Sequence, residues 1–256
     1  MFIRALFYTL ILFFYFLMNI PSVMAETPTD STRQVRTILI TGFYDWRDLG
    51  SPPDPTRCRD NPSCRILASE GMGTRGFSGP LSTILKKWSK NQSNLKIEFA
   101  LLPVTWSGLG QIHREKYQLI IHLGLGVYDR FHRLLIEDGA YNWRKGKDAI
   151  GVSHEEKIQP DQPEILTVPP QVSLGIKRAL SAHLPSPFTL VKAPARQDNT
   201  YLCNATYYEA LLHINTTPQE NREAYFIHLP HRQGDDDHAL TEAVFEVIKT
   251  IIIDTP

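Results

Sequence analysis

Along most of the chain, runs of apolar residues alternate with polar segments that contain prolines and glycines. A buried strand gives a near-continuous apolar run, whereas a helix packed on a sheet gives apolar positions three or four residues apart. The continuous runs predict strands over residues 35–43, 95–104, 117–125, 134–136, 164–168, 187–191 and 224–230. The helical spacing predicts helices that begin near residue 78, cover 171–183 and 205–214, and extend from about 237 to 252.

This alternation of strands and helices predicts one α/β domain with helices on both faces of a sheet. No internal repeat and no linker divides the chain after residue 34. Residues 44–75 contain prolines, glycines, charges and two cysteines without periodicity, and we expect one long loop there. Long loops in compact domains are usually functional or disordered, so this segment is a candidate part of a site.

The first 25 residues have the pattern of a secretory signal. Arg4 is their only charge, residues 7–18 are almost purely aliphatic and aromatic, and Val23 and Ala25 stand where a signal peptidase selects its cleavage site. We expect cleavage after Ala25, a flexible lead-in over residues 26–34, and an exported protein, either periplasmic or secreted. The alternative is an uncleaved membrane anchor, although the apolar stretch is short for a full span. After cleavage we expect no stable membrane span.

The charge balance argues against a nucleic-acid partner. The chain has 27 Lys and Arg residues against 27 Asp and Glu residues, which gives a formal net charge of zero. No block of basic residues stands out, so the electrostatic footprint of nucleic-acid binding is missing from the sequence.

The three cysteines are too few for a disulfide framework, and no pair has the spacing of metal ligands. Cys58 and Cys64 lie close together in RCRDNPSCR, and an oxidising compartment favours the pairing of neighbouring thiols. We expect a Cys58–Cys64 disulfide that closes a small loop around Asn61; two independent thiols are the alternative. The three acids at 235–237 are expected to cap a helix, because consecutive acids do not converge on one ion. No metal site is expected.

Cys203 is left as an unpaired thiol. It follows the short extended run 200–202 and precedes the predicted helix 205–214, which places its sulfur at a helix N-terminus. Free N–H groups there favour a thiolate, lower a cysteine pKa and can stabilise a developing oxyanion. A buried structural cysteine is the alternative.

A nucleophilic thiol needs a base and a carboxylate that orients the base. His228 lies near the end of the apolar run AYFIHLP, and His122 has a similar setting in IIHLGLG. Glu137 follows the apolar run 134–136, where an acid can be catalytic or can mark the point at which a strand reaches the surface. From these patterns alone, the choice between the two histidines and the role of Glu137 stay open.

Six short motifs occur in a fixed order: TGF at 41–43, NPS at 61–63, HLGLG at 122–126, EDGAYN at 137–142, YLCN at 201–204 and FIHLP at 226–230. Together they resemble the pyroglutamyl peptidase I family of cysteine peptidases, in the order of that family and over nearly the whole chain after the signal. The resemblance implies a single three-layer α/β/α sandwich with a mixed, mostly parallel central sheet, formed by residues 35–256.

The resemblance also implies roles for matching residues. Cys203 is expected to be the nucleophile, His228 the base and then the acid, and Glu137 the partner that orients the imidazole. The pocket for the pyroglutamyl ring is expected to include Phe43, Trp46, Asn61, Leu125 of the HLGLG turn, and Tyr201. Arg144 and Lys147 stand in the neighbourhood where many bacterial members carry an arginine near the oxyanion.

The activity implied by this resemblance is hydrolysis of the amide bond after an N-terminal pyroglutamyl residue, through a thioester on Cys203. The substrates would be peptides or proteins with that N-terminus, no cofactor would be needed, and an oligomer is compatible with the family. Two alternatives remain: an exported, non-catalytic protein that binds pyroglutamyl peptides, and a thiol hydrolase that acts on another small cyclic or acyl amide.

Three departures from the family pattern set this chain apart. The segment DLGSPPDPTRCRD replaces a short glycine turn before NPS. The stretch between Pro103 and HLGLG is shorter than usual, so a peripheral helix is expected to be reduced or lost. Asp198 and Asn199 stand where the family often has Ala-Gly shortly before its nucleophile.

Overall fold

The computed structural model describes residues 35–45, 58, 60–68, 76–127, 130–217, 221–231 and 237–253. All of them belong to one unit, Val35–Pro256, which is separate from Met1–Gln34. The expected signal peptide and lead-in therefore lie outside the described residues. Within the described part of the chain, no helix combines the length and apolar character needed to cross a bilayer.

The core of the unit is a six-stranded sheet with the strand order β2-β1-β3-β10-β4-β9. Four neighbouring strands are mutually parallel, namely β2 (Leu95–Leu102), β1 (Arg36–Phe43), β3 (Leu119–Val127) and β10 (Glu223–Pro230). The strands β4 (Arg133–Glu137) and β9 (Thr189–Ala193) pair in parallel with each other, but β4 runs antiparallel to β10. The expectation of a mixed, mostly parallel sheet is confirmed.

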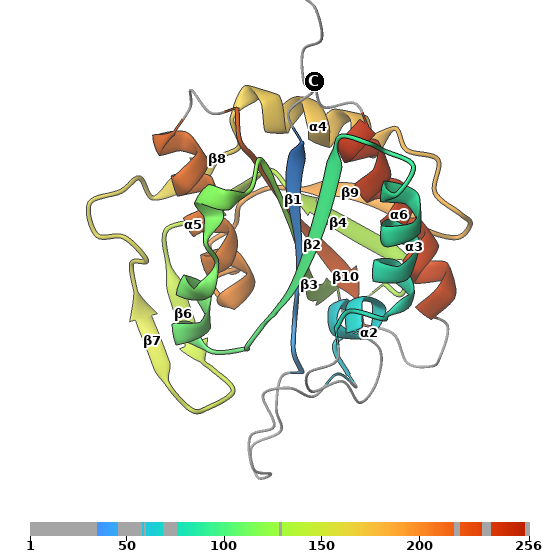
Figure 1. Ribbon diagram of the computed structural model, residues 1–256. Helices are drawn as coiled ribbons and strands as arrows, with labels where there is room; N and C mark the ends of the chain where they lie inside the picture. The colour runs from blue at the N-terminus through green and yellow to red at the C-terminus, as the bar shows by residue number, and fades with distance from the viewer. Residues whose placement is uncertain are drawn as a thin grey trace, which may run out of the picture. The chain divides into compact units, whose positions relative to one another are not determined.

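Helices cover both faces of this sheet, as Figure 1 shows. The helix α6 (Asp237–Ile253) packs against α3 (Pro80–Ser89), α4 (Pro170–Leu180) and α2 (Pro62–Ala68) on one face. On the other face, α5 (Leu202–Thr216) packs against β10 and against the 3₁₀ helix η1 (Trp106–Gln111). The three-layer α/β/α sandwich is therefore confirmed.

Strand β10 shows how the two layers share one sheet, because all eight of its residues are buried. Successive side chains of a strand point to opposite faces. Phe226 points toward α5, where its ring centroid lies 6.0 Å from that of Tyr207. Tyr225 points the other way, toward Gly175 of α4, where an added Cβ would lie 1.9 Å from the Tyr225 hydroxyl. His228 follows Phe226 by two residues and so points toward the α5 face.

The expectation of an uninterrupted loop over residues 44–75 was wrong at α2. Asn61 precedes this helix and Pro62 opens it, which are the residue types preferred at the N-cap and at the first helical position. Six of the seven residues of α2 are buried, and the helix packs on β1 and α3. The prolines and charges around the segment hid a helix that tertiary burial stabilises.

The short elements on the α5 face also differ from the expectation. The segment expected as a strand over 164–168 forms β8 (Ile165–Thr167), which pairs with β5 (Gly139–Tyr141) outside the central sheet. A second hairpin joins β6 (Arg144–Lys147) and β7 (Ser153–Glu156). Between β2 and β3 the shortened connection contains only η1 and a second 3₁₀ turn, η2 (Arg114–Lys116).

Candidate active site

The end of β1, the end of β3 and the end of β10 lie at the same edge of the sheet, because these strands are parallel. Crevices at the carboxyl ends of parallel strands are the usual ligand sites of open α/β sheets. The sheet changes direction next to this edge, where β10 meets the antiparallel strand β4. Three of the residues singled out in the sequence, Cys203, His228 and Glu137, lie near this place.

His228 and Glu137 are brought together by the antiparallel pairing of β10 with β4. His228 lies opposite Leu135, and Glu137 is two residues further along β4 on the same face. Diagonal neighbours of this kind are within reach of long side chains. Nε2 of His228 lies 2.9 Å from Oε1 of Glu137, and both side chains are buried, with 7% and 6% of their surface exposed.

Cys203 is the second residue of α5, so the expected position at a helix N-terminus is confirmed. The N–H groups of the first turn have no acceptor within the helix. Asn204 fixes this end of α5 by accepting a hydrogen bond from the backbone N–H of Tyr141 at 2.8 Å and donating to the carbonyls of Tyr141 and Trp143. The thiol is therefore held against the segment that follows Glu137.

Two glycines of β3 leave room for the thiol and the imidazole. A Cβ at Gly124 would lie 3.0 Å from Sγ of Cys203, and a Cβ at Gly126 would lie 2.0 Å from Nδ1 of His228. The thiol and the imidazole thus lie over two glycines that follow each other on the same face of β3. Nδ1 of His228 is buried and has no hydrogen-bond partner among the described residues. This nitrogen is available to receive a proton from the thiol.

His122, the rival base in the sequence, is a core residue. Its Nδ1 lies 2.7 Å from the hydroxyl oxygen of Thr41, and its side chain is fully buried. Burial, followed by the positive charge of Arg114, lowers the pKa of His122 to about 3. His228, in contrast, has its Nε2 2.9 Å from Oε1 of Glu137. The structure therefore separates the two histidines that the sequence left equivalent.

The expected lowering of the Cys203 pKa was wrong. Burial, followed by the negative charge of Glu137, raises the pKa of the thiol to about 12, and a backbone hydrogen bond opposes this shift only in part. The helix N-terminus is thus outweighed by desolvation and by a nearby carboxylate. A standing thiolate is therefore scarce at neutral pH.

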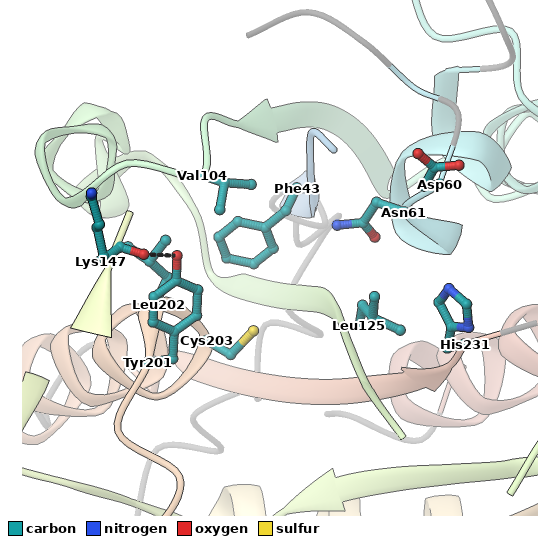
Figure 2. Close-up of a pocket in the computed structure, with 10 residues that line it drawn as sticks. All are labelled: Phe43, Asp60, Asn61, Val104, Leu125, Lys147, Tyr201, Leu202, Cys203 and His231. Atoms are coloured by element: carbon teal, nitrogen blue, oxygen red, sulfur yellow. Dashed lines mark hydrogen bonds between the residues drawn. The ribbon is translucent and has the colours of Figure 1, made fainter. Parts of the chain in front are cut away.

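A cavity of about 540 Å³ opens beside the thiol, as Figure 2 shows. In that view, Phe43, Val104 and Tyr201 lie on one side of the Cys203 sulfur. The polar residues Asp60, Asn61 and His231 lie on the other side. The complete lining consists of Phe43, Asp60, Asn61, Val104, Leu125, Lys147, Tyr201, Leu202, Cys203 and His231. An apolar and aromatic wall with a few polar groups suits a small neutral ligand.

Asn61 ties the loop after β1 to the start of α2. Its Oδ1 accepts hydrogen bonds from the backbone N–H and the hydroxyl of Ser63, at 3.0 and 2.8 Å, and its Nδ2 donates to the carbonyl of Tyr44. The Ser63 hydroxyl in turn accepts a hydrogen bond from the backbone N–H of Phe43 at 3.0 Å. Two residues that line the cavity, Phe43 and Asn61, are therefore fixed relative to each other.

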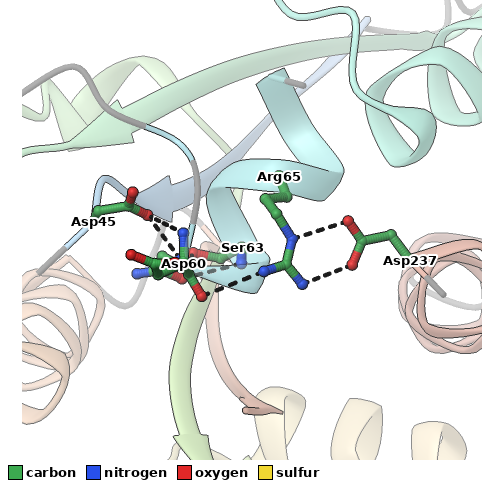
Figure 3. Close-up of polar contacts among 6 residues, drawn as sticks. Asp45, Asp60, Ser63, Arg65 and Asp237 are labelled. Atoms are coloured by element: carbon green, nitrogen blue, oxygen red, sulfur yellow. Dashed lines mark hydrogen bonds and ion pairs between the residues drawn. The ribbon is translucent and has the colours of Figure 1, made fainter. Parts of the chain in front are cut away.

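The start of α2 is also held by an ion pair and by a disulfide. Arg65 of α2 makes two hydrogen bonds to the carboxylate of Asp237 at the start of α6, at 2.9 and 2.8 Å (Figure 3). The expected Cys58–Cys64 disulfide is present, with both residues buried. Restriction of the unfolded chain by so short a loop contributes about 2 kcal/mol. The disulfide also closes the short loop that contains Asn61, and so it restrains that residue near the cavity.

Tyr201 is fixed from the side of the β6–β7 hairpin. Its hydroxyl donates to the carbonyl of Lys147 at 2.9 Å, and the ring of Trp106 packs edge-on against it at 5.5 Å. The side chain of Lys147 reaches the cavity wall, but its ammonium points away from the thiol in Figure 2. Arg144 donates to Oε1 of Glu156 across the hairpin and does not line the cavity. The choice of a basic residue for the oxyanion stays a prediction.

Several residues of the site carry no motif in the sequence. Val104, Asp60 and His231 line the cavity, and Nδ2 of Asn199 donates to Oε1 of Glu137 at 3.1 Å. The position of His231 directly after β10 was a usable signal, because a residue that ends a central parallel strand lies at the ligand edge. Trp46, expected as a wall of the pocket, lies outside the described residues. Among those residues, no group of acids, histidines and cysteines forms a metal site.

Comparison of the fold with solved structures gives a consistent result. A mutant pyrrolidone carboxyl peptidase from the hyperthermophile Pyrococcus furiosus is similar over 84% of this chain and 97% of its own, with a TM-score of 0.57 and 19% identity. The pyrrolidone carboxyl peptidase from Thermococcus litoralis is similar over 84% of this chain and 92% of its own, with a TM-score of 0.56 and 20% sequence identity. The pyrrolidone carboxyl peptidase from Fervidobacterium islandicum AW-1 is similar over 84% of this chain and 98% of its own, with a TM-score of 0.57 and 18% sequence identity. The chain has the pyrrolidone carboxyl peptidase fold.

The pyrrolidone carboxyl peptidase fold agrees with the family resemblance of the six motifs, since pyrrolidone carboxyl and pyroglutamyl are names for the same group. No model of a protein family matches the sequence, and no curated protein sequence matches it. At 18 to 20% identity the likeness is one of fold. The roles of Cys203, His228 and Glu137 depend on the contacts described above.

The raised pKa of Cys203 makes a prediction about its reaction with iodoacetamide. In a His228→Ala variant the acceptor for the thiol proton is gone, so alkylation of Cys203 should be slow at pH 7. It should then rise about tenfold per pH unit up to pH 10, because only the thiolate reacts. The rate is measured by mass spectrometry of the peptide that contains Cys203.

The matched control is the double variant His228→Ala, Glu137→Gln. It lacks the charge that is the second cause of the shift, so its alkylation should be faster than that of His228→Ala at each pH. A rate that levels off near pH 9 in the single variant would show that burial and Glu137 do not raise the pKa of this thiol.

Proposed function

We propose that this protein is a cysteine peptidase that hydrolyses the amide bond after an N-terminal pyroglutamyl residue. The observation that carries the proposal is the arrangement of Cys203 and His228 over Gly124 and Gly126, with Glu137 on the far nitrogen of the imidazole. The aromatic cavity beside the thiol and the names of the similar structures support the same substrate.

The first half of the reaction forms a thioester. Sγ of Cys203 attacks the pyroglutamyl carbonyl carbon while the thiol proton passes to Nδ1 of His228. Glu137 accepts a hydrogen bond from Nε2 and stabilises the imidazolium that results. The negative charge that develops on the carbonyl oxygen lies within reach of the free N–H groups at the start of α5. Nδ1 then gives its proton to the departing amine.

The second half of the reaction releases pyroglutamate. A water molecule takes the place of the departed amine, and Nδ1 of His228 removes one of its protons as the oxygen attacks the thioester. The carbon–sulfur bond breaks and the proton returns to Cys203. No other group is needed to balance the reaction.

Specificity follows from exclusion as much as from attraction. The pyroglutamyl ring is neutral and small, so the rings of Phe43 and Tyr201 can enclose it while its N–H and carbonyl meet polar groups of the wall. A free amino terminus placed between these two rings would carry its positive charge to the side of the Cys203 sulfur opposite Asp60, the acidic residue of the lining. Burial of an unpaired charge is costly, so ordinary N-termini are rejected.

A chromogenic pyroglutamyl amide tests this function directly, with the prolyl and glutamyl amides as comparisons. We expect turnover of the pyroglutamyl compound alone. Cys203→Ala and His228→Ala should each lower kcat by at least about 1,000-fold, and the double variant should be little worse, because the residues act as a unit. Glu137→Gln should lose less, since Glu137 orients the base and makes no bond to substrate.

The outcomes separate the proposal from its rivals. Tight binding of pyroglutamyl peptides by the wild-type protein without turnover would identify a binding protein. Turnover of a different cyclic or acyl amide, with the same loss in Cys203→Ala, would identify another thiol hydrolase. Retention of most activity by a correctly folded Cys203→Ala variant would contradict the mechanism.

Gly126→Ala makes a separate prediction about geometry. The new Cβ would lie 2.0 Å from Nδ1 of His228, so the imidazole has to move away from the thiol. A displacement of about 1 Å in a catalytic group can cost about 100-fold in rate, and we expect a loss of kcat of that order. Gly110→Ala is the matched control, because its Cβ would enter open space. Equal activity of the two variants would show that His228 is not held against β3.

We further propose that the protein is exported and begins at Glu26 after cleavage of residues 1–25. The signal-like sequence supports this, and so does the Cys58–Cys64 disulfide, since disulfides persist in oxidising compartments. N-terminal sequencing of the protein recovered from the periplasm or the medium should begin at Glu26. A chain that stays in the cytoplasm with Met1 intact would refute the export.

A further inference from the structure

Among the described residues, the side-chain carboxylate of Glu137 receives its two hydrogen bonds on one oxygen. Nε2 of His228 lies 2.9 Å from Oε1, and Nδ2 of Asn199 donates to the same atom at 3.1 Å. Oε2 is buried and has no hydrogen-bond partner among the described residues. A carboxylate only accepts hydrogen bonds, so the nitrogen of the Asn199 amide is the group that faces it. The orientation of the carboxylate toward His228 therefore depends on one further side chain.

Asn199 belongs to the chain segment that also supplies the nucleophile. Its backbone N–H donates to the carbonyl of Arg196 at 3.1 Å, which closes a turn, and the carbonyl of Thr200 accepts from the N–H of Lys145 at 2.8 Å. The helix that carries Cys203 begins two residues later. One short segment thus contacts the carboxylate through Asn199 and presents the thiol through Cys203.

We propose that Asn199 is a positioning residue that holds Glu137 in the orientation that His228 requires. The inference depends on the proposed function for its meaning in catalysis, although the contact itself does not. The donor on Oε1 matters more here because Oε2 has no hydrogen-bond partner among the described residues, so the contacts with Asn199 and His228 orient the carboxylate. At this position the sequence departs from the family pattern, so the contact is a property of this chain.

Removal of the Asn199 side-chain amide should lower kcat and leave KM nearly unchanged. Asn199 does not line the cavity, so substrate binding should be unchanged. We expect Asn199→Ala to lower kcat about tenfold with KM within about twofold, the size of effect that follows from loss of one hydrogen bond to a charged group. Asn199→Asp has the same shape but no donor when ionised, and it should be at least as impaired at neutral pH.

The control that distinguishes positioning from a structural role is the Glu137→Ala background. If Asn199 acts only through Glu137, Asn199→Ala should cost nothing further once the carboxylate is gone. A merely structural role for the turn would cost the same factor in both backgrounds. Asp198→Ala, on the exposed neighbour in the same turn, should leave kcat and KM within about twofold of the wild-type values.

Alkylation of Cys203 by iodoacetamide gives a second readout that needs no pyroglutamyl substrate. At pH 7 its rate depends on transfer of the thiol proton to His228, so Asn199→Ala should slow it in the wild-type background and leave it unchanged in the Glu137→Ala background. If the wild-type protein cleaves no pyroglutamyl amide, the proposed function fails and this rate still decides the role of Asn199. Wild-type kcat or alkylation rate in folded Asn199→Ala and Asn199→Asp, or an equal loss with and without Glu137, would overturn the proposal.

Discussion

His228 and Glu137 meet because the sheet reverses direction between β10 and β4. In a fully parallel sheet the end of β4 would lie at the same edge as the end of β10, and its last residue would project beyond the strands. The antiparallel pairing instead brings Glu137 back beside His228, one diagonal step away on the same face. The buried contact of 2.9 Å between them then fixes which nitrogen of the imidazole is left for the thiol. A Cβ at Gly126 would lie 2.0 Å from that nitrogen, and the Cys203 thiol lies over Gly124 on the same strand.

The nearness of Glu137 to both His228 and Cys203 has opposite electrostatic effects on the two residues. In the proposed mechanism Glu137 stabilises the imidazolium that forms during the reaction, but burial and the charge of the same carboxylate raise the pKa of Cys203. Proton transfer from the thiol to the imidazole turns that conflict into an attraction, because the imidazolium lies between the two negative groups. In the proposed mechanism, Cys203 is a thiol at rest and becomes reactive when its proton passes to His228. The contact from Asn199 holds the carboxylate that faces His228.

The loop after β1 shows how a departure from the family pattern can be accommodated. The inserted segment is followed by the Cys58–Cys64 disulfide, the Asn61 cap of α2 and the Arg65–Asp237 pair. Each of these holds the start of α2, and through Ser63 they hold the end of β1 where Phe43 lines the cavity. The start of α2 and the end of β1 are thereby held together, with Phe43 in the wall of the cavity.

Much of this protein was determined by local sequence alone. Near-continuous apolar runs predicted the strands of the central sheet, and the short run before Cys203 predicted its place at a helix N-terminus, because burial on two faces and the start of a helix leave local patterns. The disulfide was predicted from two nearby cysteines. The helix α2 was missed because its stability comes from burial against β1 and α3, and the pKa of Cys203 was predicted with the wrong sign because desolvation and the charge of Glu137 are set by residues far apart in the chain. Only the tertiary structure decided between His122 and His228 and revealed Asn199, since both answers depend on which side chains the strand order and the reversal at β4 bring within hydrogen-bonding distance.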